Sequence, residues 1–109
     1  GFAEGIRSYM NGEGEYLLNS SKMIVKNCDF SFGKAILLQG GSQFNLITDN
    51  NAKRSAYEIL SDNNVVSNNT GNSNVNSWGY YVTGINNTVF NNTASFNRFG
   101  LYITESFNG

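Results

Sequence analysis

Residues 79–108, GYYVTGINNTVFNNTASFNRFGLYITESFN, contain two similar strand patterns that begin at Gly79 and Gly100, 21 residues apart. In each pattern the residues after the glycine alternate between an aliphatic or aromatic inward position and an outward position. Such alternation with a period of two is typical of a β-strand that has one buried face. Between the two patterns lies a shorter apolar segment centred on Val89, with asparagines on both sides. The stretch therefore predicts a repeat built from short strands.

The same patterns recur along most of the chain. One inward position aligns at spacings of 21, 21, 23 and 21 residues in Leu17, Leu38, Ile59, Val82 and Ile103. A second inward position lies two residues earlier, in Glu15, Ile36, Tyr57, Tyr80 and Leu101. The short segments between them align in Val25, Ile47, Val66 and Val89. A repeat of this length with two or three strands predicts an all-β fold, a right-handed parallel β-helix of about five coils with roughly 21 residues each.

The chain of 109 residues is long enough for a single domain, residues 1–109. The repeats cover residues 14–109, and residues 1–13 match them poorly. The last repeat stops halfway through a coil. We expect either a piece of a longer solenoid or a subunit that polymerises head to tail.

The repeats from Gly79 to Asn108 resemble those of the NosD-like family in the pectin-lyase-like superfamily, which run Gly-Ile-Tyr-Leu, a Ser/Asn turn, then Asn-x-Ile-x-x-Asn. The match is good over residues 14–27 and looser over residues 33–76. The resemblance implies the parallel β-helix architecture and no particular chemistry, because enzymes, phage tailspikes and structural proteins share it. The copper delivery that the NosD name suggests is not expected, because the chain has no histidine and only Met10, Met23 and Cys28 as soft ligands.

Asparagine recurs two residues after the short apolar column. The aligned positions are Asn27, Asp49, Asn68 and Asn91. We expect these side chains to point inward and to form a structural ladder, since each amide can bond to its equivalents in the coils above and below. Asp49 is then either a tolerated substitution or an ion site. Asn87, two residues before Val89, is expected to point inward as well.

Four Asn-x-Ser/Thr sequences are candidate glycosylation sites, and they begin at Asn19, Asn68, Asn86 and Asn91. If Asn68 and Asn91 point inward, they cannot carry a glycan. We therefore expect that only Asn19 and Asn86 could be modified, with no glycan at any site as the alternative.

The composition argues against several functions. The chain has no histidine, and its eight carboxylates form no Asp-Asp or Asp-x-Asp pair, so we predict no catalytic residues, no metal site and no cofactor. A net charge of −1 without a basic patch argues against nucleic acid, and apolar runs of at most four residues argue against membrane insertion. The single Cys28 excludes an internal disulfide and is expected to be a buried apolar side chain.

One surface remains as a candidate binding site. The outward positions between the two inward columns are Tyr16, Leu37, Glu58, Tyr81 and Tyr102, with Trp78 and Phe99 at the edge. Regularly spaced aromatic side chains can stack on sugar rings or dock a partner subunit, but tyrosine also suits a half-exposed strand.

We hypothesise a non-enzymatic, extracellular or cell-surface β-solenoid that acts as a structural module and self-associates end to end through its open ends into a filament. A periplasmic location is also compatible with the sequence. The alternative is a carbohydrate-binding or carbohydrate-processing module, a fragment of a pectin-lyase-like enzyme or a tailspike.

Overall fold

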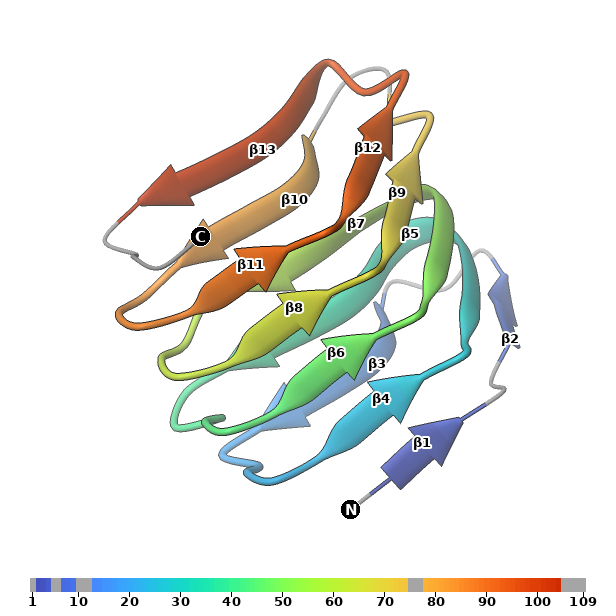
Figure 1. Ribbon diagram of the computed structural model, residues 1–109. Coiled ribbons are helices and arrows are strands. Elements are labelled where there is room, and N and C mark those ends of the chain that lie inside the picture. The colour runs from blue at the N-terminus through green and yellow to red at the C-terminus, as the bar shows by residue number, and fades with distance from the viewer. Residues whose placement is uncertain (1, 5–6, 10–12, 75–77, 105–109) are drawn as a thin grey trace.

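The structure, a computed structural model, describes residues 2–4, 7–9, 13–74 and 78–104, and every regular element in them is a β-strand (Figure 1). The strands are β1 Phe2–Glu4, β2 Arg7–Tyr9, β3 Glu13–Leu18, β4 Ile24–Lys26, β5 Asp29–Gln39, β6 Leu46–Thr48, β7 Asn51–Ile59, β8 Val65–Ser67, β9 Thr70–Asn72, β10 Trp78–Thr83, β11 Thr88–Phe90, β12 Thr93–Ser95 and β13 Phe99–Thr104.

The short apolar segments form one face of the fold. In this face β1, β4, β6, β8 and β11 make a five-stranded parallel sheet in that order. Figure 1 shows these strands side by side, from blue at the N-terminal end to orange at the C-terminal end. Each strand therefore pairs with the equivalent strand of the next turn, and not with its neighbour in sequence.

Two further faces share the long strands β5 and β7. The first three residues of β5 pair with β2 on one side and with the first three residues of β7 on the other. These residues of β7 pair in turn with β9, and β9 pairs with β12. The later residues of β5 pair with β3 on one side and with β7 on the other. β7 then pairs with β10, and β10 pairs with β13. β7 changes face at Arg54, whose φ is 56°. Each turn thus runs through three faces, and the chain is a parallel β-solenoid, as the repeat predicts.

The coil count differs slightly from the predicted five. Three turns, which begin with β4, β6 and β8, are stacked between neighbouring turns on both sides. The strands β1–β3 and β11–β13 belong to the first and the last described turn. Among the described residues, no helix is long or apolar enough to cross a membrane.

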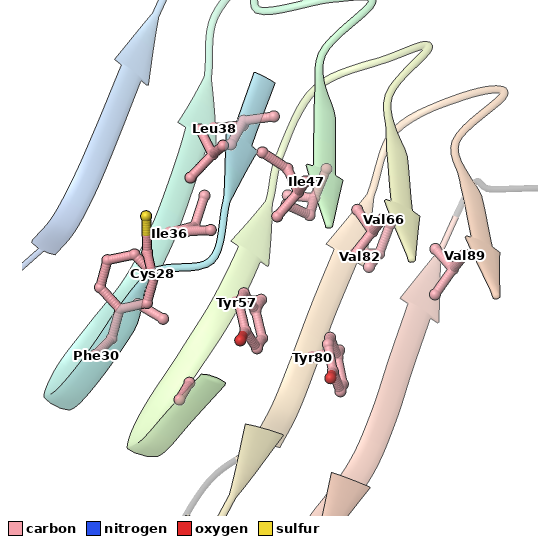
Figure 2. Close-up of a cluster of buried hydrophobic side chains, with 14 residues drawn as sticks. Cys28, Phe30, Ile36, Leu38, Ile47, Tyr57, Val66, Tyr80, Val82 and Val89 are labelled. Atoms are coloured by element: carbon pink, nitrogen blue, oxygen red, sulfur yellow. The ribbon is translucent and has the colours of Figure 1, made fainter. Parts of the chain in front are cut away.

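The predicted inward columns are confirmed by the strand register. Leu38 pairs with Ile59 and Ile59 with Val82, and all three are fully buried. On the opposite face Ile47 pairs with Val66, and both are fully buried too. Figure 2 shows the side chains of the two faces meeting in the interior. Each such aliphatic side chain contributes roughly 1.5–3 kcal/mol relative to an exposed one.

Two tyrosines belong to this interior. Tyr57 and Tyr80 occupy equivalent positions on β7 and β10, and their rings stack at 4.9 Å with an angle of 9°. Their hydroxyl groups donate hydrogen bonds to the carbonyl oxygens of Thr70 at 2.9 Å and Thr93 at 3.0 Å. Burial raises the pKa of both phenols, that of Tyr57 with a further contribution from Tyr80. The core therefore accepts these polar side chains because each hydroxyl has a backbone acceptor.

Leu37 differs from the prediction of an outward, half-exposed position. Its neighbours Ile36 and Leu38 point into the core, and Leu37 lies outside that core cluster, yet it is only 2% exposed. Its column neighbour Glu58 is itself partly buried. The outward position at Leu37 is therefore buried, whereas the equivalent positions Tyr81 and Tyr102 on β10 and β13 are partly exposed or exposed.

Candidate functional site

The corners between faces explain why the chain contains so much asparagine. At the corner between the first and second faces, the backbone adopts a left-handed conformation at Asn27, Asp49, Asn68 and Asn91, with φ between 54° and 56°. All four side chains are exposed. The prediction that they form the inward ladder is therefore wrong. A left-handed residue interrupts the alternation of the strand, so the inward position passes to the next residue in the chain.

The inward ladder consists of Asn50, Asn69 and Asn92, one residue further along. Asn69 Oδ1 accepts hydrogen bonds from the backbone N–H and the Nδ2 of Asn50, both at 3.0 Å. Asn92 Oδ1 accepts the same pair of bonds from Asn69, again at 3.0 Å. The amides also donate downward, from Asn50 to Val25 O at 3.0 Å and from Asn69 to Ile47 O at 2.9 Å. The side-chain amides of Asn50 and Asn69 thus find their hydrogen-bond partners within the protein.

The other two corners are built in the same way. Asn45, Asn64 and Asn87 are buried at the corner before the short strands, each after a residue with φ of 58–59°. Asn64 Oδ1 accepts from Asn45 N at 3.1 Å and Nδ2 at 3.0 Å, and Asn87 Oδ1 accepts from Asn64 N at 2.9 Å. The inward position predicted for Asn87 is confirmed.

At the third corner, Asn97 Oδ1 accepts from both the N–H and the Nδ2 of Asn74 at 2.9 Å. Ser55 stands at the equivalent place in the preceding turn, after the left-handed Arg54. The shorter side chain of Ser55 does not continue the ladder. Its buried Oγ has no hydrogen-bond partner among the described residues.

Cys28 occupies the inward position that precedes Asn50 in the ladder of Asn50, Asn69 and Asn92, at the corner between the first and second faces. Its N–H donates to Asn50 Oδ1 at 3.0 Å, as an asparagine would, while its thiol lies 3.3 Å from Lys26 O. The residue is 1% exposed and packs in the core cluster. The prediction of a buried Cys28 without a disulfide bond is confirmed.

The corner geometry also accounts for three of the four candidate glycosylation sequences. In each Asn-Asn-Thr triplet the first residue is left-handed and exposed, the second belongs to the inward ladder, and the threonine begins the next strand. The triplets begin at Asn68, Asn86 and Asn91. The expected distinction between a modifiable Asn86 and a buried Asn68 or Asn91 is wrong, since all three are exposed.

Asn19, the fourth candidate, is exposed with φ of 52°, and its Oδ1 accepts a hydrogen bond from Gly41 N at 2.8 Å. The left-handed backbone therefore accounts for asparagine at these places whether or not a glycan is attached, and glycan occupancy at all four sites stays a prediction.

An aromatic surface covers the outer side of β10 and β13. Tyr81 and Tyr102 are paired in register, and their rings stack at 5.0 Å with an angle of 7°. Trp78 meets the edge of Tyr81 at 5.0 Å and lies 6.0 Å from Phe99. The guanidinium of Arg98 lies 5.4 Å above the Phe99 ring, within cation–π range. The structure therefore brings Trp78, Tyr81 and Tyr102 together as predicted, whereas the side chain of Tyr16 lies outside the described part.

A shallow, open groove of about 410 Å³ lies beside this surface. It is lined by Glu58, Leu60, Trp78, Tyr81 and Thr83. Tyr102 covers one face of the Tyr81 ring, and the register places Glu58 on the other side of Tyr81, where the groove lies. The groove therefore combines an aromatic wall with one carboxylate and one hydroxyl. The spacing of the repeats predicted the aromatic column. It did not predict that Leu60 and Thr83 line a groove beside that column.

One cation approaches the groove. Lys34 Nζ lies 3.7 Å from Glu58 Oε2, and both side chains are partly exposed. The described residues include no group of three or more Cys, Asp or Glu side chains placed to bind a metal ion. Asp49, considered above as an ion site, is exposed on the outside of its corner.

The last described turn has an open edge. Leu101 and Ile103 pair in register with Tyr80 and Val82, which are 1% and 0% exposed, yet they are themselves 50% and 38% exposed. Phe90 and Phe96 on the same turn are 44% and 84% exposed. The inward positions Leu101 and Ile103 therefore add apolar side chains to the surface of this edge, beside the outward Phe90 and the corner residue Phe96.

Comparisons with known proteins leave the family open: no protein-family model, no curated protein and no solved structure matches the chain.

Proposed function

We propose that the chain is a structural β-solenoid module that joins a further β-solenoid coil at the edge formed by β11, β12 and β13. The observation that carries this proposal is the exposure of Leu101 and Ile103, which continue a column that is fully buried in the preceding turns. Their apolar surface is stabilised when another strand stacks on β13 at the 4.8 Å spacing of the sheet. The NosD-like repeat family remains the proposed affiliation, and a location outside the cell belongs to the same proposal.

The backbone supports such a contact. The parallel register is continuous from β4 to β11 and from β7 to β13, so the last turn presents strand edges in the same arrangement as every turn before it. An open edge of this kind pairs readily with another strand. Solenoids extend in this way because each repeat contacts only its neighbours.

The test adds one turn. A second copy of residues 84–104 is inserted directly after Thr104 in the full chain, and urea unfolding and amide hydrogen exchange are measured. Stacking predicts a higher midpoint, a larger m value and slowed exchange at Leu101 and Ile103. An inserted turn that leaves the midpoint unchanged and both amides unprotected contradicts the proposal.

A second candidate function rests on the groove beside Tyr81. We propose that it binds a sugar ring, because an aromatic face with a nearby carboxylate and hydroxyl can stack on the ring and bond to its hydroxyl groups. A glycan array tests this with the wild-type chain and the Tyr81→Ala and Tyr102→Ala double variant. Phe44→Ala is a matched control, because Phe44 is 63% exposed and does not line the groove. Binding that is lost in the double variant and kept in the control supports the groove, and binding kept in both clears it of this role.

A further inference from the structure

Two polar side chains in the groove beside Tyr81 keep their hydrogen-bonding capacity for a ligand. Glu58 and Thr83 both line the groove, and both are partly buried. Within the described part of the chain, the Glu58 carboxylate contacts Lys34 at 3.7 Å and accepts no hydrogen bond, and the Thr83 hydroxyl makes none. Partly buried polar groups of this kind take their hydrogen bonds from water or from a ligand. The groove therefore offers a ligand one anionic acceptor and one hydroxyl.

One aromatic face is open beside these two groups. Tyr102 stacks on one face of the Tyr81 ring at 5.0 Å, and Trp78 meets the edge of that ring. The other face lies toward Glu58, the in-register partner of Tyr81 on β7. Strand geometry places the backbone of Glu58 about 4.8 Å from that of Tyr81, and the backbone of Thr83 about 6.6 Å further along β10 on the same side. A ring that stacks on the open face of Tyr81 therefore has Glu58 and Thr83 at its rim.

The groove carries a negative charge. Among the described residues that line it, Glu58 is the charged one. Lys34 lies on β5, in the preceding turn, and does not line the groove. Its ion pair with Glu58 spans 3.7 Å between side chains that are 41% and 24% exposed, and an exposed pair of this kind is weak. Glu58 therefore presents its negative charge to whatever enters the groove.

We infer that the groove selects a neutral sugar ring over a uronic acid, and that Glu58 determines this choice. The inference rests on the proposed sugar-binding function and names the class of sugar. A neutral ring stacks its C–H face on Tyr81, donates hydroxyl hydrogens to the Glu58 carboxylate and exchanges a hydrogen bond with Thr83. A uronic acid brings a second carboxylate into the groove, and like charges in a site partly shielded from water repel each other.

The test compares sugars in matched pairs that differ at one carbon. The methyl glycosides of glucose, galactose and mannose are titrated into the ¹⁵N-labelled chain at neutral pH and low salt, each beside the methyl glycoside of its uronic acid. Shifts of the Tyr81 and Thr83 amides give the dissociation constants. We expect at least one neutral sugar to bind at least about tenfold more tightly than its uronic acid. Added sodium chloride should reduce this preference by screening the charges, and should change the affinity of the neutral sugar by less than about twofold.

Two variants remove the same charge at different places. Glu58→Gln keeps the length of the side chain and removes the carboxylate, so the preference for the neutral sugar is expected to fall below about threefold. Asp49→Asn is the matched control, because Asp49 is exposed and does not line the groove, and it should keep the wild-type preference. The salt series tests the same charge in the unmodified chain, and so does not depend on the folding of either variant.

Uronic acids that bind as tightly as their neutral partners overturn the inference. A preference that persists in Glu58→Gln, or that salt leaves unchanged, overturns it too. In each of these cases the groove still binds sugar. A titration in which no sugar of any pair shifts the Tyr81 or Thr83 amide contradicts the sugar-binding function itself.

Discussion

Asn68 and Asn69 are consecutive asparagines at one corner, and the side chain of Asn68 faces solvent whereas that of Asn69 points into the solenoid. Asn68 is exposed, with φ of 55°, and gives the backbone the left-handed turn. Asn69 is 1% exposed and binds the turns above and below through its amide. The outer position therefore selects for backbone conformation and the inner position for hydrogen bonding. Predictions that separate the two demands follow, from the largest expected effect to the smallest.

The largest effect is expected for Asn69→Ala. The substitution removes the acceptor of the backbone N–H and of one Nδ2 hydrogen of the buried Asn50, and it removes the donor to Ile47 O. We expect a loss of about 3–6 kcal/mol in the free energy of unfolding, measured by urea denaturation. Asn68→Gly is the control, and we expect a change of about 0.5 kcal/mol or less. Equal losses at the two positions would show that the corner does not distinguish them.

Gly84→Ala is expected to disturb the hydrogen bond of the inward Asn87 through the neighbouring backbone. Gly84 has φ of 125°, and a Cβ there would contact Ser61 O, which is the acceptor of Asn87 Nδ2 at 2.8 Å. We expect a loss of about 2–4 kcal/mol from backbone strain and the displaced hydrogen bond. At Gly100 an added Cβ meets only Ala94 Cβ, at an ordinary 3.6 Å, so Gly100→Ala should cost less than about 1 kcal/mol. Thermal unfolding of both variants compares them, and an equal shift would argue against the Ser61 contact.

The outer position is tested with a residue that resists the left-handed conformation. Asn91→Val places a β-branched side chain at φ of 54°, and we expect a loss of about 1–2 kcal/mol. Asn91→Gly, which adopts the same conformation without strain, should keep the wild-type stability within about 0.5 kcal/mol. A valine variant as stable as the glycine variant in urea denaturation would mean that the backbone conformation is not what this position demands.

The comparison extends to tyrosines on the inner and outer sides of the paired strands β7 and β10. Tyr57→Phe removes the hydrogen bond to Thr70 O and should cost about 1 kcal/mol at neutral pH, whereas Tyr81→Phe on the outer surface should cost less.

The buried phenols also predict a pH dependence. Because the pKa of Tyr57 and Tyr80 is raised above the ordinary value of 10.0 in the folded chain, the unfolded chain loses these protons first as the pH rises. Stability is therefore full below pH 10 and falls above it. Urea midpoints measured between pH 8 and pH 11 should decline less steeply in the Tyr57→Phe and Tyr80→Phe double variant, and parallel declines would contradict the cause.

The strand faces could be predicted from the sequence because their inward columns repeat at a constant spacing. Val66 and Val82 lie where the alternation placed them, since packing in a strand follows directly from the period of two. The corners could not be placed by the same rule, because a left-handed residue shifts the phase by one.

Composition does not separate the outer and inner positions at the corner between the first and second faces. The outer column contains Asn27, Asp49, Asn68 and Asn91, and the inner column contains Cys28, Asn50, Asn69 and Asn92, so each has three asparagines and one other residue. The groove beside Tyr81 depends on side-chain packing across turns, so composition does not indicate it either.

The central claim is that the inner and outer corner asparagines differ in kind, and side-chain amide hydrogen exchange measures this directly. In an NMR experiment on the ¹⁵N-labelled chain, the Nδ2 hydrogens of Asn50 and Asn69 should exchange slowly, because they are buried and bonded to Asn and backbone oxygens. Those of Asn68 and Asn91 should exchange at the rate of free asparagine. Rapid exchange at Asn50 and Asn69, or protection at Asn68 and Asn91 in their place, would contradict the account.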